Sequence, residues 1–121
     1  MKYILLIYHD EDSWNRLTEV ERENIYAEYR QLIEELKSSG KFLFGNQLEA
    51  TGQSVRVRDG QTLVTDGPFA ETREQVGGFF MIEADSLNEA NSIAARIPSA
   101  RTGTIEVRPL AATAAASGPA N

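Results

Sequence analysis

The chain contains two continuous apolar runs, residues 3–8 and 78–82, of the kind that predicts strands buried on both faces of a sheet. Residues 42–48 predict a further strand. Residues 104–109 alternate apolar and polar side chains and end in a proline, as expected of a strand at a sheet edge. We therefore predict that the two apolar runs are central strands and that the other two strands are peripheral.

Two other segments space their apolar residues as a helix does. Thr18 and Glu21 match a capping box, and the helical spacing continues until Gly40, which provides a C-terminal stop. Ser86 and Glu89 cap a second helix, which a later proline ends. Each predicted helix follows a central strand and precedes a peripheral one.

A β-hairpin is predicted within residues 55–64. Its centre is Asp59-Gly60, a dipeptide favoured in two-residue type I′ turns. Such a turn pairs Val57 with Thr62, so the hairpin has a defined register.

Apart from the hairpin, the elements follow the order βαββαβ, which indicates an α+β protein with a ferredoxin-like antiparallel sheet. In that topology the strand order is 4-1-3-2, and both helices cover one face. The first strand nevertheless has two apolar faces, because Ile4, Leu6 and Tyr8 alternate with equally apolar neighbours. Since an uncovered apolar face needs a partner, we expect a homodimer packed sheet to sheet, as in a dimeric α+β barrel.

Length and composition limit the chain to one soluble folded domain. Its 121 residues are 41% hydrophobic and 25% charged, which are ordinary globular values. We assign residues 1–110 to the domain and expect the Ala-rich residues 111–121 to form a disordered tail. No apolar stretch resembles a membrane span or a signal peptide, so we expect no membrane partner.

Charge and composition also exclude several kinds of site. The net charge of −6 argues against nucleic-acid binding, which requires a basic face to displace counterions from phosphates. The chain has no cysteine, which excludes thiolate chemistry and disulfides and suits a cytoplasmic location. His9 precedes three acidic residues, but neighbouring strand residues point to opposite faces and no second histidine assists. No phosphate-binding glycine motif occurs either, so we expect neither a metal nor a cofactor.

Candidate site residues converge at one rim of the predicted sheet. The topology brings His9, Trp14, a predicted loop at residues 66–76 and Arg101 to the end where the first two strands finish and the last two begin. An imidazole, carboxylates, an arginine and aromatic rings that meet in this way form a plausible pocket for a small molecule.

His9 is the only histidine and would be a natural base if Asp66 or Glu71 orients it, or it would assist Asp66 or Glu71 as the catalytic acid or base. The alternatives are a solvated histidine at a strand end and an aspartate that hydrogen-bonds the amides of its own turn. Both interpretations stay open at this point.

Further candidates are ligand contacts. Trp14 and Phe69 would wall the pocket, although Phe69 could equally fill the core where its loop folds back. Arg73 and Arg101 would hold a polar ligand, although a run of charges on a loop is usually a solvated face.

The predicted loop carries the motif Asp66-Gly67-Pro68-Phe69, with further characteristic residues at 1–3, 55–60, 64–75, 77–80, 84–86, 97–98 and 106–109. In these residues the chain resembles the DGPF-domain branch of the YCII-related family, over about residues 1–110. The resemblance implies a ferredoxin-like dimeric α+β barrel, in agreement with the pattern above. It also implies a family most of whose members lack an assigned function.

Some YCII-related relatives are lyases that remove chloride from chlorinated aromatics by means of a His-Asp pair. That pair lies on the first helix and just before the proline that follows the second helix. Here the first predicted helix contains no histidine, and Ile97 precedes Pro98. We therefore do not expect the mechanism of those relatives in this chain.

Three kinds of function remain. The first is a lyase- or hydrolase-like enzyme that acts on a small organic substrate through Asp66, Glu71 or His9. The second is a non-catalytic module that binds a metabolite. The third is an interaction partner of an extracytoplasmic-function sigma factor, which the resemblance implies because DGPF proteins are often encoded beside such factors.

Overall fold

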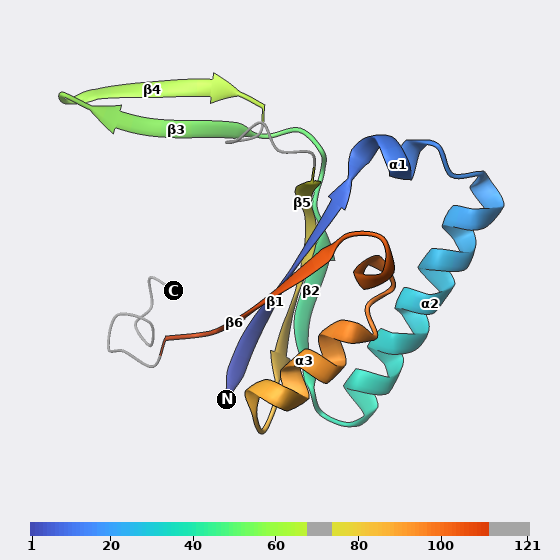
Figure 1. The fold of residues 1–121 in the computed structure, drawn as a ribbon. Coiled ribbons are helices and arrows are strands. Elements are labelled where there is room, and N and C mark those ends of the chain that lie inside the picture. Colours follow the sequence, from blue (N-terminus) through green and yellow to red (C-terminus); the bar gives the residue numbers. More distant parts are fainter. Residues whose placement is uncertain (68–73, 112–121) are drawn as a thin grey trace.

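The computed structural model describes residues 1–67 and 74–111. A four-stranded sheet forms the centre of the protein, helices cover one of its faces, and a two-stranded hairpin extends beyond one end (Figure 1). The elements in chain order are β1 (Lys2–Asp10), α1 (Glu11–Asn15), α2 (Glu19–Ser38), β2 (Phe42–Gln47), β3 (Gln53–Arg58), β4 (Gln61–Asp66), β5 (Glu74–Glu83), α3 (Leu87–Ala95), the 3₁₀ helix η1 (Pro98–Arg101) and β6 (Thr104–Pro109).

The strand order of the central sheet is β2-β5-β1-β6, and all neighbouring strands are antiparallel. This order is the predicted ferredoxin-like one, with the two apolar runs at the centre and the other two strands at the edges. β1 and β5 are longer than their apolar runs because each continues into polar residues at the rim. The predicted α+β fold class is therefore confirmed.

α2 begins at the capping box that the sequence predicts. Glu21 N donates to Thr18 Oγ1 at 3.1 Å, and Thr18 N donates to Glu21 Oε1 at 2.8 Å. These hydrogen bonds hold the pKa of the Glu21 carboxyl below its usual value. The helix ends at Ser38, and Gly40 has a φ of +73°, as the predicted stop requires.

Only one of the two hydrogen bonds of a capping box forms at the start of α3. Glu89 N donates to Ser86 Oγ at 3.1 Å, but the Glu89 carboxylate accepts from Asp85 N at 2.7 Å and does not return to Ser86. The same carboxylate lies 3.1 Å from Lys41 Nζ, just before β2. The Asp85 amide and then Lys41 lower the pKa of Glu89, so this cap also ties α3 to the edge of the sheet.

The side chains of β1 alternate between a covered and an uncovered face. Tyr3, Leu5 and Ile7 are buried beneath the helices, whereas Ile4 and Leu6 are half-buried on the opposite face. The buried core comprises Tyr3, Leu5, Ile7, Leu32, Leu36, Phe80, Ile82, Ala84, Ala90, Ile93, Ala94 and Ile97. Both faces of β1 are apolar as predicted, and the helices cover one of them.

β3 and β4 form the predicted hairpin, in which Val57 pairs with Thr62. Asp59 and Gly60 have φ values of +52° and +74°, as a type I′ turn requires. The hairpin projects away from the sheet on the side opposite to α2 (Figure 1). It makes at most marginal contact with the other helices and strands that the structure describes.

The prediction of a loop over residues 66–76 is wrong at both ends. Asp66 is the last residue of β4, and β5 already begins at Glu74. The first residues of β5 are polar and show no apolar alternation, which is why the hydrophobic pattern missed them. Residues 68–73 lie outside the described part of the chain.

β5 contains one residue more than the stretch of β1 that it pairs with. Ile7 pairs with Gly78 and Tyr8 pairs with Val76, so Gly77 is the additional residue of a β-bulge. A bulge of this kind bends its strand and re-aims the side chains around it. This bend lies at the rim where the candidate residues converge.

β6 ends at Pro109 on the sheet edge, as predicted. Most of the predicted tail, residues 112–121, lies outside the described residues. Within the ranges that the structure covers, no helix combines the length and the hydropathy needed to cross a membrane.

Candidate functional site

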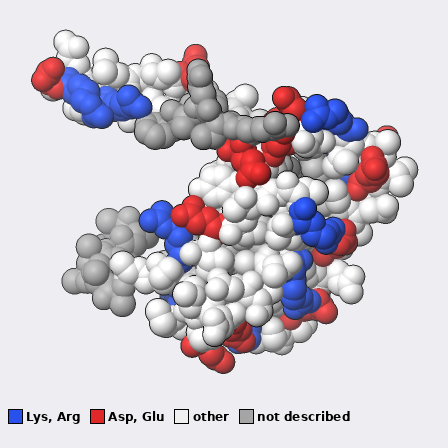
Figure 2. Space-filling model, in the orientation of Figure 1, with Lys and Arg blue, Asp and Glu red and all other residues white. Residues whose placement is uncertain are grey.

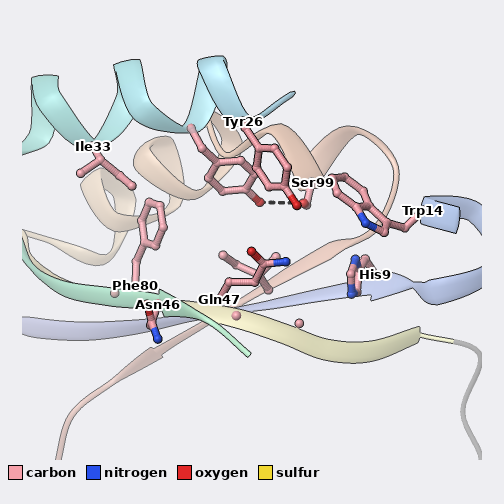
Figure 3. A pocket seen from close by; sticks show the side chains of 13 residues that line it. His9, Trp14, Tyr26, Ile33, Asn46, Gln47, Phe80 and Ser99 are labelled. Carbon is pink, nitrogen blue, oxygen red and sulfur yellow. Dashed lines mark hydrogen bonds between the residues drawn. The ribbon is translucent and has the colours of Figure 1, made fainter. Parts of the chain in front are cut away.

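A cavity of about 240 Å³ opens between α2 and the helix-covered face of the sheet (Figure 3). Its lining comes from β1, α1, α2, β2, β5 and η1, so segments from most of the chain build it. Aromatic rings and glycines supply much of this lining, and a small number of polar side chains supply the rest.

Four aromatic rings form the walls of the cavity. The rings of Trp14 and Tyr26 are 5.6 Å apart, and those of Tyr29 and Phe80 are 6.2 Å apart, both in edge-to-face arrangements. Such arrangements are favoured by the quadrupoles of the rings and add to the stabilisation from area burial. The walls are therefore apolar and flat, which suits a planar ligand.

Local structure holds Trp14 in its place. The Asp10 carboxylate caps α1 by accepting a hydrogen bond from Asp12 N at 3.1 Å. Arg22 of α2 donates to the Asn15 carbonyl at 3.0 Å, and its guanidinium lies 6.0 Å from the centre of the Trp14 ring. α2 therefore positions the short helix that carries the tryptophan.

Glycines form the floor of the cavity. Gly45 of β2 and Gly77 and Gly78 of β5 line it without side chains. A Cβ at Gly77 would collide with the imidazole of His9, and a Cβ at Gly45 would lie 3.0 Å from the ring of Phe42. Glycine inside a strand often marks a place where another group approaches the backbone closely. Here the group that approaches Gly77 is the imidazole.

His9 stands beside this floor at the end of β1. Its Nε2 lies 3.5 Å from Glu11 Oε2, and its ring centre lies 6.3 Å from that of Trp14. The side chain is 23% exposed, so the imidazole reaches both the cavity and solvent. An imidazole beside a carboxylate is an arrangement that can take up and release a proton.

Hydroxyl and amide groups face the cavity from the remaining sides. Tyr29 Oη and Ser99 Oγ are 2.7 Å apart and join α2 to η1 (Figure 3). Burial raises the pKa of the Tyr29 phenol, so the group remains a hydrogen-bond donor. Gln47 of β2 points into the cavity, whereas Asn46 points to the other side of the strand (Figure 3).

Among the described residues that line the cavity, none is a lysine, arginine, aspartate or glutamate. Its polar groups are the imidazole of His9, the indole N–H of Trp14, the carboxamide of Gln47 and hydroxyls. Carboxamides and hydroxyls donate and accept hydrogen bonds without carrying a fixed charge. A ligand with several charges, such as a phosphate ester, would find no basic counter-charge in this lining.

His9 and Trp14 also border a neighbouring hollow of about 140 Å³, which Arg101 lines. The Arg101 guanidinium donates to Glu28 Oε2 at 2.9 Å, so α2 already engages its charge. The structure thus brings together three of the predicted site residues, namely His9, Trp14 and Arg101.

Asp66 does not line the cavity beside His9. It lies at the base of the hairpin, where its Oδ1 accepts a hydrogen bond from Gln53 Nε2 at 2.8 Å. Among the described residues, Glu11 has its carboxylate beside His9. The other predicted site residues, Phe69, Glu71 and Arg73, lie outside the described residues.

Sequence reasoning did not select Tyr26, Tyr29, Gln47 or Ser99 as site residues. Tyr29 belongs to the helical spacing of apolar residues, which is typical of core packing, and Tyr26 falls outside that spacing. A usable signal was the combination of this aromatic stripe with glycines inside two strands, since glycine leaves room where a larger side chain would fill it. The position of Ser99 depends on the packing of η1 and had no signal of its own.

The fold and the cavity define a small ferredoxin-like α+β protein with an aromatic hollow between its sheet and its long helix. The chain belongs to the YCII-related domain family, which matches residues 1–113. It is also similar to an uncharacterized protein of Rhizobium meliloti (strain 1021). The two are 36% identical over 115 residues, which cover 92% of this chain and 93% of the relative. The resemblance stated from the sequence is thereby confirmed at the level of the family.

In this chain, hydroxyl groups join the two segments where the resemblance implies that some relatives carry a His-Asp pair. The hydroxyls of Tyr29 and Ser99 connect α2 to the segment after α3. Ile97, the residue before the proline, is fully buried in the core. The imidazole at this cavity therefore comes from His9 on β1 and not from a helix.

Proposed function

We propose that this YCII-related protein binds a small, flat organic molecule in the cavity between α2 and the sheet. The observation that carries the proposal is the combination of aromatic walls with a glycine floor. Apolar walls with a few convergent polar groups are the usual composition of a small-molecule site.

The lining also indicates the polarity and size of the ligand. Without a basic side chain in the described lining, it favours a neutral or singly ionised molecule. Gln47, Tyr29 and Ser99 would meet a carbonyl, hydroxyl or carboxyl group on such a ring. The volume of about 240 Å³ holds one or two rings, and an adjoining hollow of about 750 Å³, which shares His9, Trp14, Gln47 and Gly77, leaves room for substituents on them.

Trp14 permits a direct test because it is the only tryptophan of the chain. We expect a binding member of a panel of small aromatic acids, phenols and amides to change its emission saturably. The same compound should raise the melting temperature, because a ligand that binds only the folded state stabilises it. A panel in which no compound gives either response would contradict the proposal.

Two variants of α2 test whether the change in Trp14 emission comes from binding in the cavity. Ile33→Phe places a larger side chain inside it, whereas Val20→Phe adds the same ring at a position that is 70% exposed. We expect Ile33→Phe to abolish the saturable change in emission and Val20→Phe to retain it. Circular dichroism checks that both variants are folded.

One observation favours an enzyme as a second candidate function. His9 Nε2 lies 3.5 Å from Glu11 Oε2 and the imidazole borders the cavity, so His9 could transfer a proton to or from a bound molecule. We expect His9→Gln to lower turnover of such a molecule by about 10²- to 10⁴-fold while it still binds. A ligand that stays chemically unchanged with the wild-type protein would leave binding as the function.

We also propose that two copies of the chain pack through the uncovered face of the sheet. Ile4, Leu6, Phe79 and Met81 are half-buried there, and Phe44 is 59% exposed. Contiguous apolar surface of this kind favours a partner of similar character. Light scattering should give the mass of two chains for the wild type and of one chain for Leu6→Glu. A single-chain mass for the wild type at micromolar concentration would contradict the pairing.

A further inference from the structure

The hairpin of β3 and β4 exposes apolar side chains that the described part of the chain leaves uncovered. Val55, Val57 and Val64 are 62%, 61% and 55% exposed. The hairpin has at most marginal contact with the other described elements. An isolated two-stranded hairpin is only marginally stable in water. This hairpin therefore requires another surface against which to pack.

The two faces of the hairpin have different chemistry. The register places Val55, Val57 and Val64 on one face, and Arg56 and Arg58 on the other. These arginines are the hairpin's only basic residues, and they account for the blue atoms near its tip in Figure 2. The valine face has the β-branched, uncharged character of a surface that packs against protein.

The base of the hairpin is closed by hydrogen bonds. Gly67 N donates to the Gly52 carbonyl at 2.8 Å, and Gln53 Nε2 donates to Asp66 Oδ1 at 2.8 Å. The pairing then continues without a register shift to the turn. We call residues 53–66 the arm, because they form one extended element that can present a whole face at once.

The arm projects on the side of the sheet that the helices leave uncovered (Figure 1). That side carries the apolar surface around Leu6, Phe44 and Phe79. Figure 2 shows that the arm extends well beyond the body of the molecule. A second molecule packed against the uncovered sheet face would therefore lie within reach of the arm.

We propose that the arm grips a second copy of this chain, with its valine face against the surface of that copy. The proposal rests on the sheet-to-sheet pairing proposed above and adds a second contact to it. In a twofold assembly each contact occurs twice, so both uncovered apolar surfaces of each chain are buried together.

The test replaces the three valines with threonine in one variant, Val55→Thr/Val57→Thr/Val64→Thr. Threonine keeps the branched shape and the strand propensity, but its hydroxyl opposes burial without a partner. The matched control is Leu63→Thr, which changes an apolar residue on the arginine face of the same hairpin. Sedimentation equilibrium measures the dissociation constant of the dimer, and circular dichroism measures the fold.

We expect the triple variant to raise the dissociation constant roughly tenfold or more, which corresponds to about 1.4 kcal/mol, and Leu63→Thr to leave it near the wild-type value. A triple variant that dimerises as tightly as the wild type, alongside a monomeric Leu6→Glu, would overturn the arm contact and retain the pairing of sheet faces. A wild-type protein that is monomeric would overturn both.

A second measurement uses the full chain with one introduced cysteine, which is unique because the sequence has none. An environment-sensitive fluorophore on Val57→Cys should report an apolar surrounding at high protein concentration and an aqueous one after dilution. The same fluorophore on Gln61→Cys, beside the turn on the arginine face, serves as the control. A label at position 57 that remains in water at all concentrations refutes the arm contact.

Discussion

Tyr29 and Ser99 share a hydrogen bond of 2.7 Å that ties α2 to η1 beside the cavity. We expect Tyr29→Phe and Ser99→Ala each to lower the free energy of unfolding by about 1 kcal/mol, the usual net value of such a bond. The double variant should lose less than the sum of the two, because both single changes remove the same contact. Denaturant unfolding of the four proteins measures this coupling, and strictly additive losses would show that the hydroxyls do not interact.

The same tyrosine predicts a dependence of stability on alkaline pH. Burial raises the pKa of Tyr29 above its ordinary value of 10.0, so the unfolded chain loses this proton first as the pH rises. The contribution of the group is fully present below pH 10.0 and is lost as the pH passes through the higher pKa of the folded state. The difference in stability between wild type and Tyr29→Phe should therefore narrow above pH 10.0. A difference that stays constant there would contradict the assignment.

Gly77→Ala should displace the imidazole of His9, because a Cβ at position 77 would collide with that ring. His9 is the only histidine, so its ring protons give an NMR signal that can be assigned without ambiguity. We expect this signal to shift in Gly77→Ala and to stay in place in Gly52→Ala, where a Cβ would meet no atom within 4 Å. An unchanged signal in Gly77→Ala would show that the ring is not held against the floor.

Leu5 and Leu6 are neighbours on β1 that face opposite sides of the sheet. Leu5 is 0% exposed, and Leu5→Ala should lower the free energy of unfolding by about 2–5 kcal/mol, as the loss of a fully buried leucine side chain does. Leu6→Ala should cost less in dilute protein and more as the concentration rises, if a second copy covers it. Thermal unfolding over a dilution series makes the comparison, and equal costs at every concentration would contradict it.

The central sheet could be predicted because its two inner strands are apolar on both faces. Residues 3–8 and 78–82 indicate strands without reference to tertiary structure, and the capping residues Thr18 and Glu21 mark where the chain becomes helical. The start of β5 at Glu74 could not be predicted in the same way. Its polar residues extend the strand because they continue the ladder with β1, which depends on the partner strand and not on local pattern.

The cavity was harder to foresee than the fold. His9, Trp14 and Arg101 could be placed together from the sequence, because strand ends that meet at one edge follow from topology alone. Asp66 was expected at the same rim, but the hairpin ladder continues to Asp66 and its carboxylate accepts a hydrogen bond from Gln53. Which side chains form hydrogen bonds inside a hairpin depends on local contacts, and the order of the elements does not predict them.

The bulge at Gly77 determines which face of the sheet the side chains of β5 point to at the rim. A regular ladder through the same residues would pair Tyr8 with Gly77 and His9 with Val76, and the side chains of β5 before Gly77 would turn to the opposite face of the sheet. Val76 would then face the helices, on the side where His9 now stands beside bare backbone. The extra residue therefore keeps Val76 on the uncovered face and leaves the imidazole of His9 beside a residue without a side chain. A relative that pairs these two strands without the bulge can thus have a different rim even when most of its residues are identical.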